Sequence, residues 1–219
     1  AERCRERIGI MGKIRVAGVI PARWGSSRFP GKSLAQICGK PLIQWVLERA
    51  QQAHLLDELI VATDDERICC VADALGARTV MTRSDHVSGT DRVAEAVDGL
   101  DCGVVVNIQG DEPLIDPCLI DRLAEVMLAD ESLPMATAAA PLHAPQAESP
   151  AICKVVVNGS GCALYFSRCP IPFVRDRDFR ATETLYWRHI GLYVYRAAFL
   201  RALVQEPPSL LERAECLEQ

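Results

Sequence analysis

Cations and hydroxyls are concentrated in one short loop near the N-terminus of the chain. The segment ARWGSSRFPGKS places Arg23, Ser26, Arg28 and Lys32 within ten residues, together with two glycines. Guanidinium, ammonium, hydroxyl and backbone N–H groups are the donors that bind phosphate oxygens. A solvated loop whose charges face water is the alternative. Because the loop follows an apolar strand, at the position where open α/β sheets bind ligands, the sequence favours a polyphosphate site.

A Walker A loop would also bind phosphate here, through the pattern G-x-x-x-x-G-K-[ST]. In this chain five residues, not four, separate Gly25 from Gly31, and Pro30 removes a backbone N–H directly before Gly31. The dinucleotide pattern G-x-G-x-x-G is absent from this turn. The loop is therefore expected to bind phosphate in another way.

A second polar string follows another apolar run. Gln109 and Asp111 come directly after GVVVNI, with Gly110 between them. Mg²⁺ takes oxygen ligands, usually one or two carboxylates completed by water and phosphate oxygens, so Asp111 is the candidate metal ligand. Glycine at position 110 would let a ligand approach the backbone closely. A turn stabilised by an aspartate is the alternative.

Two more polar segments follow predicted strands. The acidic pair Asp64-Asp65 either accepts a ribose hydroxyl or caps the helix that follows, and the cap is favoured. Residues 82–92 form a polar loop between a strand and a helix. A lone histidine in such a loop, here His86, is more often a surface residue than a ligand.

A sheet must bring these loops together. Apolar, β-branched runs predict strands at 14–21, 59–63, 78–81 and 103–109, and helical spacing predicts helices at 41–54, 64–75, 91–100 and 116–128. Strands that alternate with helices indicate βαβ units. We therefore expect an α/β fold of three layers around a mostly parallel open sheet, with the polar loops at the carboxyl edge of its strands.

The later part of the chain has another character. Residues 141–150 read as a loop rich in alanine and proline, and residues 170–184 as a charged, irregular segment. Strands are predicted at 153–157 and 163–166, joined at Asn158-Gly159 as a hairpin, and at 189–195. Helices are predicted at 196–204 and 210–219. This pattern indicates a hairpin subdomain added to the sheet.

Composition excludes several classes of protein. The chain has 219 residues, 49% hydrophobic and 24% charged, which is the balance of a globular protein and not of a disordered one. The net charge of −5 makes a duplex-DNA binder a poor interpretation. No apolar run reaches about 18 residues, so no membrane-spanning helix is expected.

Ten cysteines are present, none spaced C-x-x-C, and residues 1–13 lack the apolar core of a secretion signal. We expect reduced thiols that act as small apolar residues in a cytoplasmic protein, and an N-terminal extension over residues 1–13.

The phosphate loop resembles, position by position, the signature of sugar-activating cytidylyltransferases. That signature is R-x-x-S-x-R-x-P-x-K followed by G-K-P, which here is Arg23 to Lys32 and residues 39–41. The sequence most resembles the 3-deoxy-D-manno-octulosonate (Kdo) cytidylyltransferase family, from about residue 14 to the last residue. The resemblance implies a Rossmann-like nucleotide-diphospho-sugar transferase fold. It also implies that Arg23, Ser26, Arg28 and Lys32 hold the triphosphate of CTP.

The other polar segments resemble further motifs of the same family. Residues 82–92 match T-R-x-D-H-x-S-G-T-x-R, which implies cytosine recognition by Arg83 and the backbone of Ser88, Gly89 and Thr90. Residues 109–113 match Q-G-D-E-P, and later segments match Y-F-S-R-x-x-I-P and H-x-G-x-Y. For two of the implied sugar ligands, His189 and Tyr193, a place in the core or in a dimer contact is the alternative. The implied sugar-binding residues are Gln109, Arg168, His189, Tyr193 and Glu215.

The resemblance implies an activity. The anomeric hydroxyl of Kdo would attack the α-phosphorus of CTP, with Mg²⁺ on Asp111 and with Arg23 and Lys32 taking up the charge of the leaving pyrophosphate. The product, CMP-Kdo, would serve lipopolysaccharide synthesis, and the enzyme would be a homodimer. Two alternatives stay open: the same chemistry on 8-amino-Kdo or another 2-keto sugar acid, or a nucleotide-binding remnant without activity.

The expected organisation is a single nucleotidyltransferase domain over residues 14–219. Its nucleotide-binding half covers residues 14–140, and its sugar-binding and dimer half covers residues 141–219. Family members continue past L-E-Q into a G-x-D-T-P-x-D segment, whose first aspartate is a second magnesium ligand. Because that segment is absent from this sequence, we expect the second half to be incomplete at its C-terminus.

Overall fold

The computed structural model describes residues 16–25, 29–176 and 184–217, which form two compact units. Unit 1 contains the described residues up to Ala136 together with Leu192–Gln205, and unit 2 contains Thr137–Gly191 and the residues from Glu206 onward. The expected functional halves, residues 14–140 and 141–219, stay a prediction. Residues 192–205 belong to unit 1 because the end of β10 (Tyr186–Arg196) pairs with β6 (Val104–Ile108).

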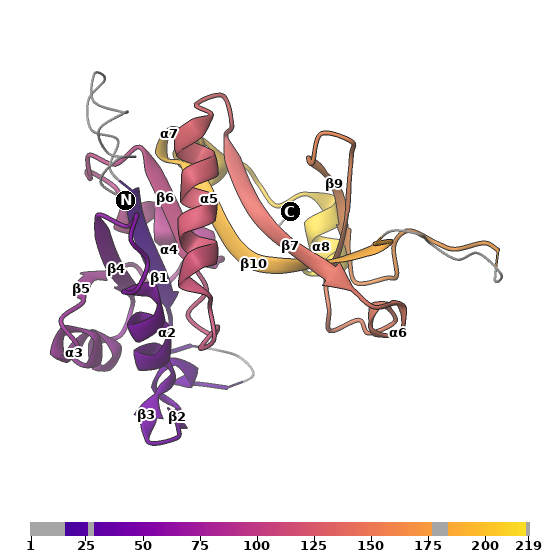
Figure 1. Ribbon diagram of the computed structural model, residues 1–219. Helices are drawn as coiled ribbons and strands as arrows, with labels where there is room; N and C mark the ends of the chain where they lie inside the picture. Colours follow the sequence, from indigo (N-terminus) through magenta and orange to yellow (C-terminus); the bar gives the residue numbers. More distant parts are fainter. Residues whose placement is uncertain (1–15, 26–28, 177–183, 218–219) are drawn as a thin grey trace. The chain divides into compact units, whose positions relative to one another are not determined.

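The sheet of unit 1 has the strand order β5-β4-β1-β6-β10 (Figure 1). The strands β1 (Val16–Ala22), β4 (Glu58–Thr63), β5 (Arg78–Met81) and β6 run parallel, and only β10 is antiparallel to its neighbour β6 in this unit. The predicted mostly parallel α/β sheet is therefore confirmed. Positions 14 and 15 of the first predicted strand lie outside the described residues.

Helices cover both faces of this sheet. On one face α2 (Leu42–Ala50) packs with α5 (Pro117–Ala129), and on the other α4 (Gly89–Ala96) packs with α7 (Ala197–Leu203), as Figure 1 shows. The helix α3 (Glu66–Ala74) contacts β4 and β5. The short elements after the first strand are a 3-10 turn, η2 (Lys32–Leu34), and the two-residue strands β2 (Gln36–Ile37) and β3 (Lys40–Pro41).

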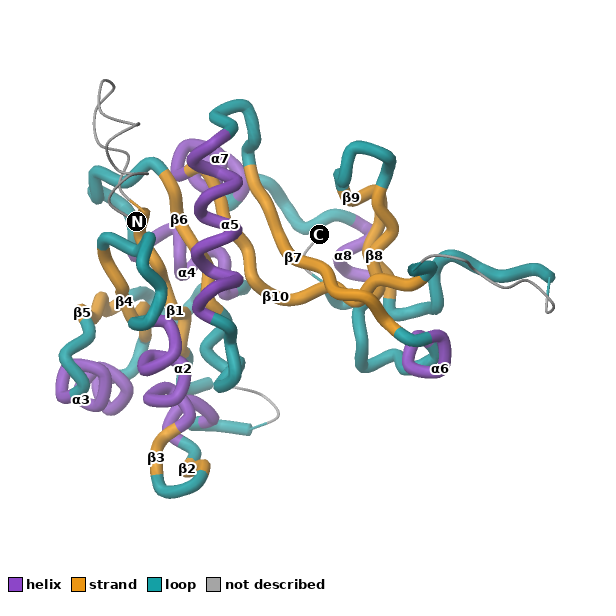
Figure 2. Tube along the Cα trace, in the orientation of Figure 1, coloured by secondary structure: helices purple, strands orange, loops and turns teal. Residues whose placement is uncertain are grey.

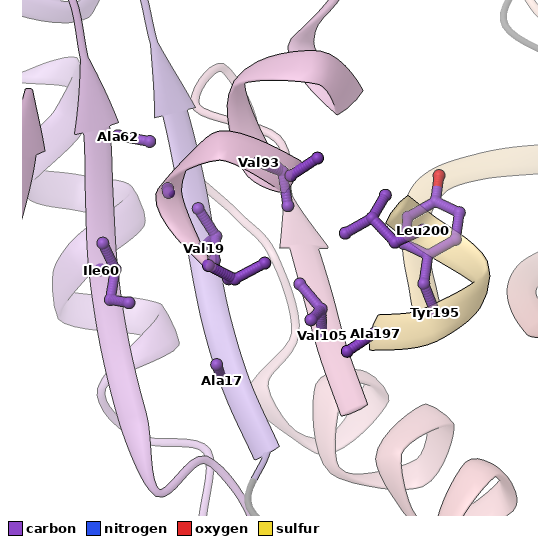
Figure 3. Close-up of a cluster of buried hydrophobic side chains, with 12 residues drawn as sticks. Ala17, Val19, Ile60, Ala62, Val93, Val105, Tyr195, Ala197 and Leu200 are labelled. Carbon is purple, nitrogen blue, oxygen red and sulfur yellow. The ribbon is translucent and has the colours of Figure 1, made fainter. Parts of the chain in front are cut away.

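The core on the α4 and α7 side of the sheet consists of small and branched side chains (Figure 3). Val19 and Val105 come from adjacent strands, and Val93 of α4 and Leu200 of α7 pack over them. All four side chains are fully buried. Burying one valine or leucine contributes about 1.5–3 kcal/mol, so this cluster fixes the strands whose carboxyl ends carry the polar loops.

Unit 2 is built on antiparallel pairing. Its hairpin consists of β8 (Lys154–Val157) and β9 (Ala163–Ser167), and β8 also pairs with the first part of β10 (Figure 2). The predicted turn at Asn158-Gly159 lies in the hairpin loop, where the Asn158 N–H donates to the Cys162 carbonyl at 2.9 Å. Two helices complete the unit, α6 (Ala144–Ala147) and α8 (Leu210–Glu215).

Besides the two-residue strands β2 and β3, one long strand was not predicted from the sequence. The segment Met135–Leu142 forms β7, which pairs with β10, whereas its last residues were expected to begin a loop. Its sequence, MATAAAPL, contains four alanines and no valine or isoleucine, so it lacks the β-branched signature of a strand. Pairing with the long strand β10 overrides that weak local preference.

Two expectations drawn from composition also have an outcome. The cysteines among the described residues are free thiols, but none is buried, and six are exposed. These thiols carry no disulfide among the described residues, as expected, and Cys102 packs partly buried against the core on the α4 and α7 side. The six exposed cysteines do not pack as small apolar residues, because the core of unit 1 is filled by valine, isoleucine, leucine and alanine. Among the described residues no helix is long and apolar enough to cross a membrane.

Candidate active site

Lys32 and Asp111 meet at the carboxyl edge of the sheet. The Nζ of Lys32 donates to Oδ2 of Asp111 at 2.5 Å, although the two residues are 79 positions apart in the chain. Both side chains are partly exposed, 41% for Lys32 and 49% for Asp111. The structure thus brings together the cation predicted to bind phosphate and the carboxylate predicted to bind metal.

The other predicted phosphate ligands are placed in part. Arg23 follows β1 directly and is exposed. Ser26 and Arg28 lie outside the described residues. Gly31 has a φ of 70°, a backbone conformation that favours glycine, and it precedes η2 so that Lys32 starts a turn at the sheet edge.

The glycine next to Asp111 lies against the end of β1. A Cβ at Gly110 would lie 2.7 Å from the carbonyl oxygen of Pro21, so this position needs glycine for the packing of two strand ends, and the close approach of a ligand stays a prediction. Gly89 of the cytosine-loop candidate also lies against Pro21, with its Cβ position 3.6 Å from the proline ring. Pro21, near the end of β1, therefore packs against both Gly110 and Gly89.

A methyl group at position 110 should disturb this packing. We expect Gly110→Ala to lower the free energy of unfolding by about 1–3 kcal/mol, because backbone atoms must move to relieve the contact. Gly159→Ala is the matched control, since a Cβ at Gly159 meets nothing within 4 Å. Urea unfolding of both variants measures the difference, and equal stabilities would contradict this account of Gly110.

A buried arginine links the ends of β4 and β5. Arg92 is 2% exposed, and it donates to Oδ2 of Asp64 at 3.0 Å and to the hydroxyl of Thr82. The second oxygen of Asp64 accepts the N–H of Trp24 at 3.2 Å. Asp65, by contrast, is the N-cap of α3 and accepts the N–H of Arg67. Of the acidic pair, one member is therefore the predicted cap and the other holds a buried cation.

The candidate cytosine loop is largely engaged with itself. The guanidinium of Arg83 pairs with Asp85 at 2.9 Å, which raises the pKa of Arg83 above its ordinary value. Ser88 is the N-cap of α4: its hydroxyl accepts the Asp91 N–H, and its own N–H donates to the Asp91 carboxylate. A contact between Ser88 and a base would have to compete with this capping box.

A pocket of about 670 Å³ opens beside this loop, within unit 1. Its walls come from the loop, from the polar face of α4 and from the end of α7. In the pocket wall, His86 pairs with Glu95. Burial is the largest single influence on the pKa of the Glu95 carboxyl and raises it, but the hydrogen bonds from His86 and from the Arg83 N–H, with the charges of both residues, together lower this pKa below its ordinary value.

The predicted sugar ligands are divided between the two units. Gln109 and Tyr193 belong to unit 1, where the Tyr193 ring stacks on Tyr195 with centroids 6.1 Å apart. Arg168, His189 and Glu215 belong to unit 2. That the five side chains bind one sugar stays a prediction.

Glu215 and Arg168 contact each other in unit 2. The Glu215 carboxylate accepts the Ser167 hydroxyl at 2.6 Å and the Arg168 N–H at 3.0 Å, and these donors lower the pKa of Glu215. The Arg168 guanidinium donates to backbone carbonyls, among them that of Glu215 at 2.9 Å. The hydrogen bonds attach α8 to the end of β9.

His189 is mostly buried. Its Nε2 lies 2.9 Å from the Thr137 hydroxyl, and its ring meets the edge of Phe166 at 4.8 Å. Burial lowers the pKa of His189 from 6.5 to about 4, so the imidazole is neutral near pH 7.

This shift predicts a pH dependence of stability. Because the folded pKa lies below the unfolded one, the unfolded state binds more protons, and stability present above pH 6.5 is lost as the pH falls towards 4. Between pH 7 and pH 5 the loss from this group is about 2 kcal/mol. From pH 7 to pH 5, the free energy of unfolding of His189→Gln should fall by about 2 kcal/mol less than that of the parent protein, as measured by urea unfolding. The exposed His54→Gln should behave as the parent does, and a His189→Gln curve parallel to the parent's would contradict the assignment.

The donors around Asp111 suit a metal ion only together with other ligands. Among the described residues no three His, Cys, Asp or Glu side chains are grouped so that they could hold one. Asp111 offers a single, half-exposed carboxylate that Lys32 contacts. One carboxylate completed by phosphate oxygens and water is an ordinary Mg²⁺ arrangement, so the residues present fit an ion that binds together with a polyphosphate.

Comparisons with known proteins identify the family of the chain. The family described as cytidylyltransferase matches residues 17–219. The chain is 49% identical over 207 residues to a 3-deoxy-manno-octulosonate cytidylyltransferase of Bdellovibrio bacteriovorus, covering 94% of this chain and 84% of the relative. The chain belongs to this cytidylyltransferase family. A relative of the same name from Nitratidesulfovibrio vulgaris is 52% identical, covering 92% of this chain and 81% of that one.

Solved structures resemble this family member as well. A CMP:2-keto-3-deoxy-manno-octonic acid synthetase complexed with CTP is 45% identical and has a TM-score of 0.86, covering 93% of this chain and 83% of the other. A cytidylyltransferase of Leptospira borgpetersenii has a TM-score of 0.60 at 17% identity, covering 91% of this chain and 68% of the other, and that likeness concerns the fold alone.

The sequence did not reveal the structural role of two buried cations of this cytidylyltransferase, Arg92 and Lys154. Arg92 ends the family-like segment of residues 82–92 and Lys154 lies in the predicted strand 153–157, and neither was assigned a role from the sequence. Lys154 is fully buried and donates to the carbonyls of Ser149, Ile152 and Arg168. Burial lowers the pKa of Lys154. The available signal was that each cation stands beside apolar residues in a predicted element.

Proposed function

We propose that this chain transfers CMP from CTP to the anomeric hydroxyl of Kdo and releases pyrophosphate. The observation that carries the proposal is the meeting of Lys32 and Asp111 at the carboxyl edge of a parallel sheet. An ammonium group beside a carboxylate can receive a metal–nucleotide complex, with the phosphates on the cation and the metal on the carboxylate. The relatives that the chain resembles over more than nine-tenths of its length carry the name of this activity.

The reaction needs positioning and neutralisation of charge more than covalent chemistry. The anomeric hydroxyl attacks the α-phosphorus and loses its proton to water, the bond from that phosphorus to the bridging oxygen breaks, and the pyrophosphate leaves with the electron pair of that bond. We assign Arg23 and Lys32 to the charge on the leaving pyrophosphate, with Ser26 and Arg28 as further triphosphate ligands. Asp111 would hold Mg²⁺, which when bound neutralises phosphate charge and orients oxygens.

The two substrates are assigned to different sets of residues. Arg83 and the backbone of Ser88, Gly89 and Thr90 are proposed for cytosine. A 2-keto sugar acid carries a carboxylate and many hydroxyls, which suit arginine, histidine, tyrosine, glutamine and glutamate side chains. The proposed sugar ligands are Gln109, Arg168, His189, Tyr193 and Glu215.

The working form of the enzyme is proposed to be a cytoplasmic homodimer that supplies lipopolysaccharide synthesis. Unit 2 exposes Leu164, Phe173 and Leu210, each more than half accessible, and such side chains suit an interface. Sedimentation velocity measures the mass in solution. A monomer at enzyme-assay concentration would remove the dimer from the proposal and leave the chemistry intact.

The proposal is tested by pyrophosphate release with Mg²⁺, CTP and Kdo, and with ATP, GTP and UTP in place of CTP. We expect release that depends on both CTP and Kdo and that is weak with the other nucleotides. Replacement of Kdo by 8-amino-Kdo in a parallel reaction identifies the preferred sugar. If the protein binds CTP but releases no pyrophosphate with either sugar, a nucleotide-binding role is favoured and the transferase proposal is overturned.

A further inference from the structure

We propose that Trp24 is a positioning residue for the triphosphate of CTP, and that the acidic pair after β4 holds it from two sides. The inference rests on the proposed function and adds to it a residue that need not touch substrate. Trp24 lies in the phosphate loop, one position after Arg23. The N–H, the ring and the carbonyl of Trp24 each contact a different residue, namely Asp64, Arg67 and Gly31. Each of these residues makes further contacts of its own.

The backbone of Trp24 is held by Asp64. The Trp24 N–H donates to Oδ1 of Asp64 at 3.2 Å, and Oδ2 of the same carboxylate accepts Arg92 at 3.0 Å. Arg92 is almost fully buried and also donates to Thr82. A carboxylate held by a buried guanidinium has one orientation, so the first residue after Arg23 is tied to the ends of β4 and β5.

The ring of Trp24 is held by Arg67. The guanidinium carbon lies 3.2 Å from the ring centroid, which is a cation–π contact. Asp65 binds the same guanidinium through two hydrogen bonds, at 2.8 and 2.6 Å, and Asp65 is itself the N-cap of α3. The ring is therefore fixed relative to α3, although Arg67 is largely exposed.

The far side of the phosphate loop packs on Trp24. The Gly31 N–H donates to the Trp24 carbonyl at 2.9 Å. A Cβ at Gly31 would lie 2.7 Å from the Trp24 ring, so glycine is the residue that fits under it. The Gly31 carbonyl accepts Leu34 at 2.9 Å and thereby starts η2, which carries Lys32.

These contacts connect Trp24 to the reacting groups through one turn of chain. If the ring is removed, Gly31 loses its packing partner, and Lys32 loses the fixed turn from which it reaches Asp111. A misplacement of about 1 Å in a positioning group can reduce a rate about a hundredfold. Because Lys32 and its loop are proposed to bind the triphosphate, the effect should fall on CTP and not on Kdo.

The experiment measures kcat and both KM values in Trp24→Ala, Trp24→Phe and Arg67→Ala. We expect Trp24→Ala to raise KM for CTP about tenfold or more and to leave KM for Kdo within about twofold. Trp24→Phe keeps an aromatic ring under Arg67 and should recover most of the loss. Arg67→Ala should raise KM for CTP about threefold. Arg78→Ala is the matched control, because Arg78 is likewise an exposed arginine paired with an acid, Glu58.

Several results would overturn the inference. One is an unchanged KM for CTP in a folded Trp24→Ala protein, and another is an equal rise of KM for both substrates. If Trp24→Ala does not fold, the comparison of Arg67→Ala with Arg78→Ala decides, and identical KM values for CTP would refute the role.

Calorimetric titration with CTP alone separates this inference from the proposed function. Absence of turnover in the parent, together with tight CTP binding that Trp24→Ala weakens about tenfold, would refute the transferase and support the positioning role. A parent chain that binds no CTP refutes both.

Discussion

Asp111→Asn should lower kcat of the proposed CMP transfer about 100- to 1000-fold. The substitution keeps the size of the side chain and its hydrogen-bonding capacity towards Lys32, but removes the negative charge. A neutral amide binds Mg²⁺ far less well than a carboxylate does, and among the described residues no cluster of three His, Cys, Asp or Glu side chains offers another metal site. The loss should appear in kcat with CTP and Kdo both saturating, measured as pyrophosphate release.

Asp101→Asn is the control for this prediction. Asp101 is exposed and precedes the other end of β6, so it shares the strand with Asp111 but not the edge. We expect its kcat to stay within about twofold of the parent, as is usual for exposed surface positions. If raising Mg²⁺ to tens of millimolar restores part of the Asp111→Asn activity, the lost interaction is with the ion. An Asp111→Asn enzyme of parental activity would place the metal elsewhere.

The central strands of unit 1 could be predicted because their sequences are almost entirely apolar or β-branched. Val104–Ile108 reads VVVNI and Glu58–Thr63 reads ELIVAT, and such runs fit a parallel strand covered on both faces. Residues 135–142 could not be predicted in the same way. Alanine has no β-branched side chain, and what makes this segment a strand is its partner β10, which lies about fifty residues later in the chain.

The charged residues of the candidate site could be predicted from the sequence. Lys32 and Asp111 both follow apolar strands, and the carboxyl ends of parallel strands meet at one edge, so their proximity follows from the fold class. The packing of Gly110 against Pro21 could not be predicted, because the sequence does not tell whether a ligand or the Pro21 carbonyl approaches a glycine. That distinction depends on how closely β1 and β6 approach each other.

The buried cations could not be assigned partners from the sequence. The partner of Arg92 is Asp64, which lies 28 positions earlier in the chain. The two residues are neighbours only because of the parallel order of the strands. For Lys154 the partners are backbone carbonyls, which every residue possesses and which therefore leave no mark in the residue types. A sequence motif can indicate that such a lysine matters, but its physical reason appears only with the loops around it in place.

Lys154→Met should destabilise unit 2 by about 3 kcal/mol. Three carbonyl oxygens, those of Ser149, Ile152 and Arg168, accept hydrogen bonds from the Lys154 ammonium, and the side chain is fully buried. A buried acceptor left without a donor costs about 1–3 kcal/mol, while removal of a buried charge recovers part of that loss. Methionine has nearly the same length and keeps the packing of the stem.

Lys40→Met is the control for the same chemical change at a partly exposed site. Lys40 pairs with Glu48 at 2.8 Å, and such surface pairs contribute about 0–1 kcal/mol. Urea unfolding compares the two variants, and hydrogen exchange over residues 154–167 locates the loosened region, which should be the β8–β9 hairpin. Since Lys154 also fixes the carbonyl of Arg168, KM for Kdo should rise in the folded fraction while KM for CTP stays unchanged. Equal stability of the two variants would show that the three carbonyls find other donors, and that the buried ammonium is not what holds these loops together.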